Sequence, residues 1–141
     1  IPDTTELDAF DAAFGFQPPA EPLLEPIFTE GTGDSLGDIV DWDVPDEITI
    51  APPAALAGMK IRAFPDRDKS HKRLKDLADL HALLWYVADY DTLRSTLQQQ
   101  ITDDDVTAFT STVTDQLYDR TARLIDVDST IVRQSIEQLF V

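Results

Sequence analysis

The chain has no cysteine among its 141 residues, so it can form neither a disulfide bond nor a zinc–thiolate site, and it offers no thiolate nucleophile. It also lacks an apolar run of about 20 residues, the length that crosses a bilayer, and a charged leader followed by an apolar stretch. We therefore expect a cytoplasmic protein that does not enter a membrane. The chain begins at Ile1 and its only methionine is Met59, which predicts a processed protein or part of a longer one.

Lysine is scarce: 4 Lys and 7 Arg stand against 21 Asp and 6 Glu, and the formal net charge is −16. A surface that is rich in aspartate and poor in lysine stays hydrated in concentrated salt, where the repulsion between like charges is screened. This composition predicts a halophilic, archaeal protein. The alternative is an acidic domain of a mesophile.

All four lysines lie in one window, residues 60–75, with three arginines and only two aspartates, so this window carries a net charge of +5. A positive patch on a negative body is typical of a protein that binds an anion such as a nucleotide, RNA or phosphate. Alternatively, the cations only neutralise the protein's own acids. We name as the basic patch the candidate binding residues Arg67, Lys69, Lys72, Arg73 and Lys75.

The sequence predicts an α+β protein that is mostly helical. Residues 1–20 form an N-terminal segment or linker, and residues 21–141 form a single domain whose hydrophobic content is sufficient for one core. Within it, residues 21–50 contain short apolar clusters separated by Gly, Pro and Asp, which favours a few short strands and a loop at residues 30–38.

Residues 51–141 show helical spacing, capping residues and helix-favouring composition, which predict about five helices. Ser70 is the predicted N-cap of the second of these, and Thr102 that of the fourth. The predicted helices cover residues 52–64, about 71–88, 91–101, about 102–125, and from Asp128 or Ser129 onward.

Lys60 lies beside Met59 and Ile61 on the first of these helices, so its surroundings are largely apolar. A lysine in this position either extends its ammonium group to water along the apolar surface or holds it on a rigid helix to meet a phosphate. His81 lies on the apolar stripe of the next helix, which predicts a hydrogen-bonded core histidine. Neither His71 nor His81 has the spacing of a metal ligand, and we predict no metal site from them.

Asp76 and Asp79 interrupt that same apolar helix. Each has a lysine four residues before it, Lys72 and Lys75, but such pairs contribute only about 0.2–0.5 kcal/mol each. This energy is too small to explain two carboxylates on an apolar helix, which favours a second purpose for them. The alternative is a charged stripe that simply faces water.

The segment APPAALAGMKIRAFPDRDKSHKRLKDLADLHALL, with its flanks about residues 48–88, resembles the latter half of AbiEii-type nucleotidyltransferases, the toxins of certain abortive-infection and toxin–antitoxin systems. Those proteins have a lysine in an LxxxK helix, matched here by Leu56 to Lys60. A basic stretch and a KDLxDL helix then follow. The residues that match this second motif are Lys75, Asp76, Leu77, Asp79 and Leu80.

The resemblance implies the C-terminal half of a polymerase-β-like nucleotidyltransferase. Lys60 would then hold nucleotide phosphates, and Asp76, with Asp79 next to it, would support the catalytic constellation. The resemblance also implies a nucleoside triphosphate and Mg²⁺ as cofactors, RNA or another acceptor as substrate, and an antitoxin as partner.

One departure from the family pattern is serious. The family's metal-binding signature, Gly-Ser followed by Asp-x-Asp, is not found, and the nearest candidate, GDSLGDIVDWD, is compressed. We therefore expect a C-terminal portion of a longer enzyme that is inactive alone. The alternatives are a non-catalytic module that binds RNA or an acidic partner through the basic patch, and a structural helical domain whose cations only balance acids.

Overall fold

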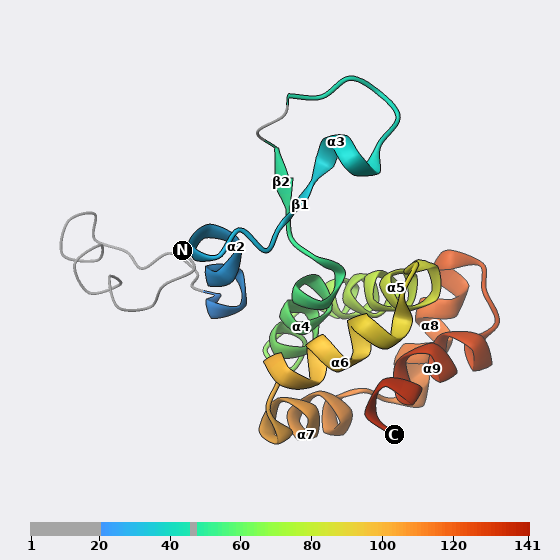
Figure 1. The fold of residues 1–141 in the computed structure, drawn as a ribbon. Coiled ribbons are helices and arrows are strands. Elements are labelled where there is room, and N and C mark those ends of the chain that lie inside the picture. Colours follow the sequence, from blue (N-terminus) through green and yellow to red (C-terminus); the bar gives the residue numbers. More distant parts are fainter. Residues whose placement is uncertain (1–20, 46–47) are drawn as a thin grey trace, which may run out of the picture. The chain divides into compact units, whose positions relative to one another are not determined.

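The computed structural model describes residues 21–45 and 48–141, and the chain divides into two compact units, residues 1–55 and 56–141. The described part is mostly helical and includes a two-stranded antiparallel sheet, which confirms the predicted fold class (Figure 1). The amphipathic segment predicted within residues 1–20 lies outside the described residues.

The sheet belongs to the first unit. Strand β1 (Asp34–Ser35) pairs with β2 (Thr49–Ile50), and Asp34 stands opposite Ile50. Gly33 precedes β1, and a Cβ at this position would collide with the side chains of Thr49 and Ile27. Glycine is therefore required where the chain enters the sheet.

The apolar clusters at residues 23–28 are helical, and the strands predicted there are wrong. They lie in η1 (Pro22–Leu24) and α2 (Glu25–Thr29), and a third short helix, α3 (Leu36–Ile39), follows β1. Each of the first two helices has a proline in its first turn, where the missing N–H does no harm. The Glu21 carboxylate also accepts a hydrogen bond from the Leu23 N–H at 3.2 Å.

Two consecutive helices carry most of the predicted site residues. Helix α4 (Pro53–Ala63) begins in the last residues of the first unit, and α5 (Ser70–Tyr86) lies in the second. Ser70 is not the N-cap that the sequence predicts, because the helix begins one residue earlier. Lys69 takes the capping position with an extended backbone and makes no side-chain cap hydrogen bond.

Four further α-helices complete the described part of the second unit, where the sequence predicts three. The single helix predicted over residues 102–125 is interrupted at Val113, because the Thr114 hydroxyl accepts a hydrogen bond from the Leu117 N–H and begins a new helix. Thr102 caps the first of the two, as predicted. The elements are α6 (Tyr90–Gln100), α7 (Asp103–Thr112), α8 (Asp115–Ile125), α9 (Ser129–Glu137) and the 3₁₀ helix η2 (Gln138–Phe140).

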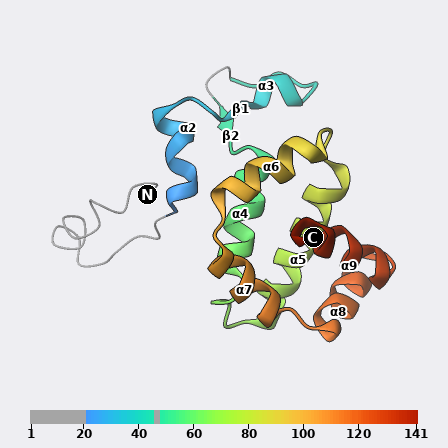
Figure 2. The same ribbon diagram turned by 60° about the horizontal axis from the view of Figure 1, so that its bottom comes forward.

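The core of the second unit forms where α5 packs against α8 and α9 (Figure 2). Phe109 joins it to the end of α4, because its ring centroid lies 5.0 Å from that of Phe64 and 5.5 Å from that of Phe140. His81 is buried, and its Nδ1 lies 2.8 Å from the Ser135 hydroxyl, which confirms the predicted core histidine. This packing buries one side of α5, including Asp76, and leaves Lys72 and Lys75 on the exposed side.

Candidate functional site

The predicted lysine and both predicted aspartates meet at one point. Lys60 extends from α4 towards α5, where its Nζ lies 2.9 Å from Oδ1 of Asp76 and 2.7 Å from Oδ2 of Asp79. The two aspartates are three residues apart on α5, so their side chains lie on neighbouring turns of one face. One ammonium group thus binds both carboxylates.

Asp76 is the buried member of this group, with 2% of its surface exposed. Its second oxygen, Oδ2, accepts a hydrogen bond from Nε of Arg67 at 2.8 Å, so a single carboxylate joins two cations. A buried carboxylate is costly without hydrogen bonds, and here each oxygen has a charged donor. We name Lys60, Arg67, Asp76 and Asp79 the ionic cluster.

Asp76 and Asp79 stabilise the charged forms of Lys60 and Arg67. Burial alone would lower the pKa of Lys60, but its hydrogen bonds to Asp79 and Asp76 outweigh that effect, and the pKa is raised. The hydrogen bond to Asp76 likewise raises the pKa of Arg67. Lys60 and Arg67 are therefore charged at any physiological pH.

Arg73, a member of the basic patch, is committed to the turn between α4 and α5. Its Nη2 donates to the Pro65 carbonyl at 3.3 Å, and its guanidinium lies over the Phe64 ring at 5.7 Å from the ring centroid. These contacts tie the start of α5 to the end of α4. The structure therefore gives Arg73 a part in holding the two helices that bear Lys60 and Asp76.

Lys69, Lys72 and Lys75 are exposed and form no ion pair with any residue that the structure describes. The pairs of Lys72 with Asp76 and of Lys75 with Asp79, which the sequence spacing allows, are not formed. Both oxygens of Asp76 bind Lys60 and Arg67 instead, and Oδ2 of Asp79 binds Lys60. The basic patch is thus divided: its two arginines have partners within the fold, and its three lysines face water.

The sequence did not show that Arg67 is a partner of Asp76. The two residues are nine apart, and the contact depends on how the turn after α4 folds back towards α5. The only local signal was that Pro65 ends α4 just before Arg67, which predicts a turn at this place.

The carboxylates do not form a metal site by themselves. Within residues 21–45 and 48–141, no group of three or more His, Asp or Glu side chains could hold a metal ion. Mg²⁺ takes oxygen ligands in near-octahedral geometry, usually one or two carboxylates with substrate phosphates and water. Lys60 already occupies an oxygen of each of Asp76 and Asp79, so the described residues do not fit the implied Mg²⁺.

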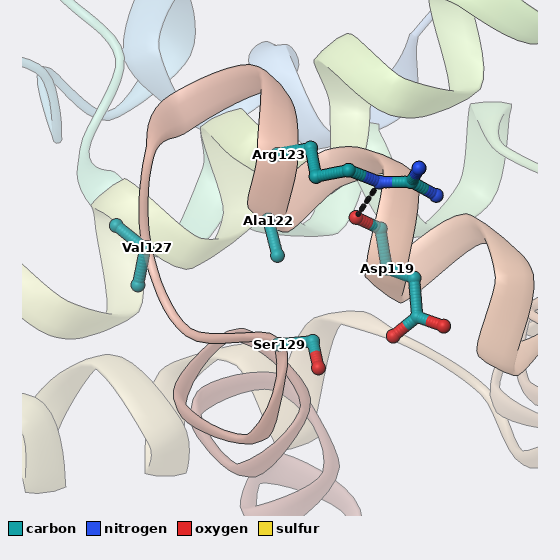
Figure 3. Close-up of a pocket in the computed structure, with 5 residues that line it drawn as sticks. All are labelled: Asp119, Ala122, Arg123, Val127 and Ser129. Atoms are coloured by element: carbon teal, nitrogen blue, oxygen red, sulfur yellow. Dashed lines mark hydrogen bonds between the residues drawn. The ribbon is translucent and has the colours of Figure 1, made fainter.

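A separate hollow of about 340 Å³ lies where α8 turns into α9 (Figure 3). Arg123 points along one wall, and its Nε donates to the Asp119 carbonyl at 3.2 Å. Ala122, Val127 and Ser129 complete the lining, so none of the residues in the ionic cluster or the basic patch contributes to it.

In a comparison with protein families, residues 6–138 match the family described as "Nucleotidyl transferase AbiEii toxin, Type IV TA system". Searches among curated proteins and among solved structures found no match. None of the helices in the described part of the chain has both the length and the apolar character that a bilayer crossing requires.

Proposed function

The chain belongs to the AbiEii family of nucleotidyltransferase toxins, and from that membership we propose that its ionic cluster binds the phosphates of a nucleoside triphosphate. The observation that carries the proposal is the position of Lys60 Nζ, which Asp76 and Asp79 hold at 2.9 and 2.7 Å. Lys60 is thus held in place between its own helix, α4, and two carboxylates of α5 before any ligand binds. This preorganisation lowers the entropic cost of binding.

Lys60 retains the capacity to bind. An ammonium group has three N–H donors, and in Lys60 two of them are directed to carboxylates. The Lys60 side chain is 26% exposed, so its remaining donor can reach a phosphate oxygen from solvent. Arg67 supports the same ligand, because only its Nε is used by Asp76 and its Nη groups remain as further donors.

Asp76 acts on the ligand only through the cations, and we assign it as a positioning residue. Asp76 is buried, and its two oxygens orient Lys60 and Arg67 through ion pairs. Asp79 differs, because its side chain is 40% exposed and can move away. We propose that a phosphate oxygen displaces Asp79 from Lys60 and exchanges one anion for another at the same cation.

The proposed reaction transfers a nucleotidyl group to an acceptor hydroxyl. The acceptor hydroxyl loses its proton to water and its oxygen forms a bond to the α-phosphorus. The bond from that phosphorus to the bridging oxygen breaks, and pyrophosphate leaves with the electron pair. Lys60 and Arg67 stabilise the charge on the leaving pyrophosphate. Because the described carboxylates do not fit the Mg²⁺ that the family resemblance implies, we expect these 141 residues to bind nucleotide without turnover.

The exposed lysines serve the acceptor in this proposal. Lys69, Lys72 and Lys75 lie on the first half of α5 and at the turn before it, where they can contact the phosphates of an RNA strand. The family's place in toxin–antitoxin systems supports an antitoxin as functional partner. A non-catalytic module that binds RNA through the same lysines is the second candidate, favoured by the lack of a metal-binding set among the described residues.

The test is calorimetric titration of the protein with nucleoside triphosphates. We expect Lys60→Ala to weaken binding by about tenfold or more, as loss of a charge-assisted hydrogen bond does. Lys69→Ala is the matched control, because it removes an exposed lysine outside the ionic cluster, and its dissociation constant should change little. Equal dissociation constants for Lys60→Ala and the wild-type protein would overturn the proposal.

A further inference from the structure

We propose that Tyr86 is the platform on which the base of the bound nucleotide stacks, an inference that rests on the proposed function and extends it from phosphate to base. Tyr86 is 79% exposed, the most exposed aromatic residue among those that the structure describes. It makes no hydrogen bond or ring contact with any described residue, so the fold itself does not account for it.

Tyr86 lies on the same helical stripe as the charged residues. The positions Lys72, Lys75, Asp79, Ala82 and Tyr86 follow one another at intervals of three and four residues, which places them on one face of α5. This is the face opposite the core, because the buried residues of α5 fall at other positions. The stripe therefore continues from exposed lysines, past the carboxylate that binds Lys60, to an exposed ring.

The spacing along this stripe suits a nucleotide. Asp79 and Tyr86 are seven residues apart, about 10 Å along the axis at a rise of about 1.5 Å per residue. Helical side chains generally lean towards the N-terminus, which favours a position of the Tyr86 ring on the Ala82 and Asp79 side of its Cα. The ring and the cation on Asp79 are thus separated by a length of the order that separates the base of a nucleotide from its outer phosphates.

The stripe on α5 between Asp79 and Tyr86 carries no large side chain. Ala82 is exposed and carries only a methyl group, so no large side chain of α5 fills the stripe between Asp79 and the ring. A base laid on Tyr86 would cover an aromatic face that is otherwise in water. Stacking of this kind is tolerant of base identity, because every base presents a π-face.

The neighbouring Trp85 does not share this position. It is 54% exposed, but its ring centroid lies 5.7 Å from that of the buried His81, so it packs partly against its own helix. One residue along a helix is a rotation of about 100°, which directs Trp85 away from the charged stripe. Trp85 is therefore the matched aromatic control.

The experiment compares ligands that carry a nucleoside with one that does not. The protein and its variants are titrated with ATP, CTP, GTP and UTP, separately with inorganic tripolyphosphate, and with a short single-stranded RNA. We expect Tyr86→Ala to weaken nucleotide binding by at least about fivefold and to leave tripolyphosphate binding unchanged. Tyr86→Trp should retain nucleotide binding, and Trp85→Ala should match the wild-type protein.

Each other outcome is decisive. Unchanged nucleotide affinity in Tyr86→Ala, or an equal loss for tripolyphosphate, would overturn the base platform and leave the role of Lys60 intact. A loss confined to a short single-stranded RNA would overturn the assignment to a mononucleotide. If the wild-type protein binds neither nucleotide nor tripolyphosphate, the proposed function fails together with this inference.

Discussion

Oδ1 of Asp76 lies 2.9 Å from Nζ of Lys60, although sixteen residues separate the two in sequence. The carboxylate is buried and the ammonium is partly exposed, so the acid is the fixed element and the cation is its outward extension. The other oxygen of Asp76 holds Arg67 in the same way. One aspartate thus determines where two positive charges stand.

Asp76→Asn should therefore be the most damaging single change in the ionic cluster. The amide can no longer accept two charge-assisted hydrogen bonds, and its NH₂ group would face a cation. Because Lys60 and Arg67 are partly solvated, we expect a loss of about 2 kcal/mol in the free energy of unfolding, measured by urea denaturation. Asp79→Asn is the control: its side chain is 40% exposed, and its loss should stay below about 1 kcal/mol. Equal losses would contradict the structural role of Asp76.

Removal of the exposed lysines should change the salt dependence of RNA binding. For single strands the logarithm of the binding constant falls with the logarithm of salt concentration, with a slope of about −0.7 per neutralised phosphate. The double variant Lys72→Ala/Lys75→Ala should reduce the steepness of this slope by about 1.4. Replacement of Arg123, which lies on α8 outside the basic patch, is the comparison. A slope identical to that of the wild-type protein would exclude contact between these lysines and phosphates.

His81 should make the stability of the protein fall in mild acid. Burial lowers the pKa of His81 below its ordinary value of 6.5. The unfolded chain therefore takes up a proton on this residue at a higher pH than the folded one. The contribution to stability is complete above about pH 6.5 and is lost as pH falls through the folded pKa. Urea midpoints between pH 5 and 8 should show that the wild-type protein loses stability relative to His81→Gln. Parallel curves for the two proteins would contradict this assignment.

Thr114→Ala should weaken the start of α8. The Thr114 hydroxyl accepts from the Leu117 N–H at 3.3 Å, and alanine leaves that donor only its 3.0 Å bond to the Thr114 carbonyl. Loss of an N-cap of this kind typically costs about 1 kcal/mol of stability. Thr112→Ala is a suitable control, since its hydroxyl bonds only to the Ala108 carbonyl within α7. If the two variants unfold at the same urea concentration, the cap does not hold α8.

Local chemistry explains which parts of the fold were predictable. Thr102 and Asp128 cap helices as predicted. An N-cap side chain accepts a hydrogen bond from a backbone N–H only two or three residues later, so the local sequence is enough to predict it. The break at Val113 carried the same type of signal in Thr114, but continuous apolar spacing concealed it. At residues 22–29, alternating proline and apolar pairs suit short helices as well as strands, and the neighbouring capping group decided the outcome.

The ionic cluster was predictable only in part. The i, i+4 rule pairs Asp76 with Lys72, yet the observed partners, Lys60 and Arg67, come from the preceding helix and turn. Burial explains the difference: Asp76 lies on the inner side of α5, where Lys72 cannot follow it without leaving water. The family motif brought Lys60 and Asp76 into one hypothesis, but neither spacing nor charge indicated that a single carboxylate would hold two cations.

The exposed lysines of the basic patch and the partly buried Lys60 differ in their access to water and salt, and therefore in the distance over which each attracts an anion. In molar salt the Debye length is only about 3 Å, so the long-distance pull of the fully hydrated lysines disappears and they act only on contact. The ammonium of Lys60, seated on the buried Asp76, is less affected, because counterions cannot surround it. At higher salt concentration, long-range attraction of any polyanion by the exposed lysines should therefore weaken, and direct contact with Lys60 should contribute most of the selectivity.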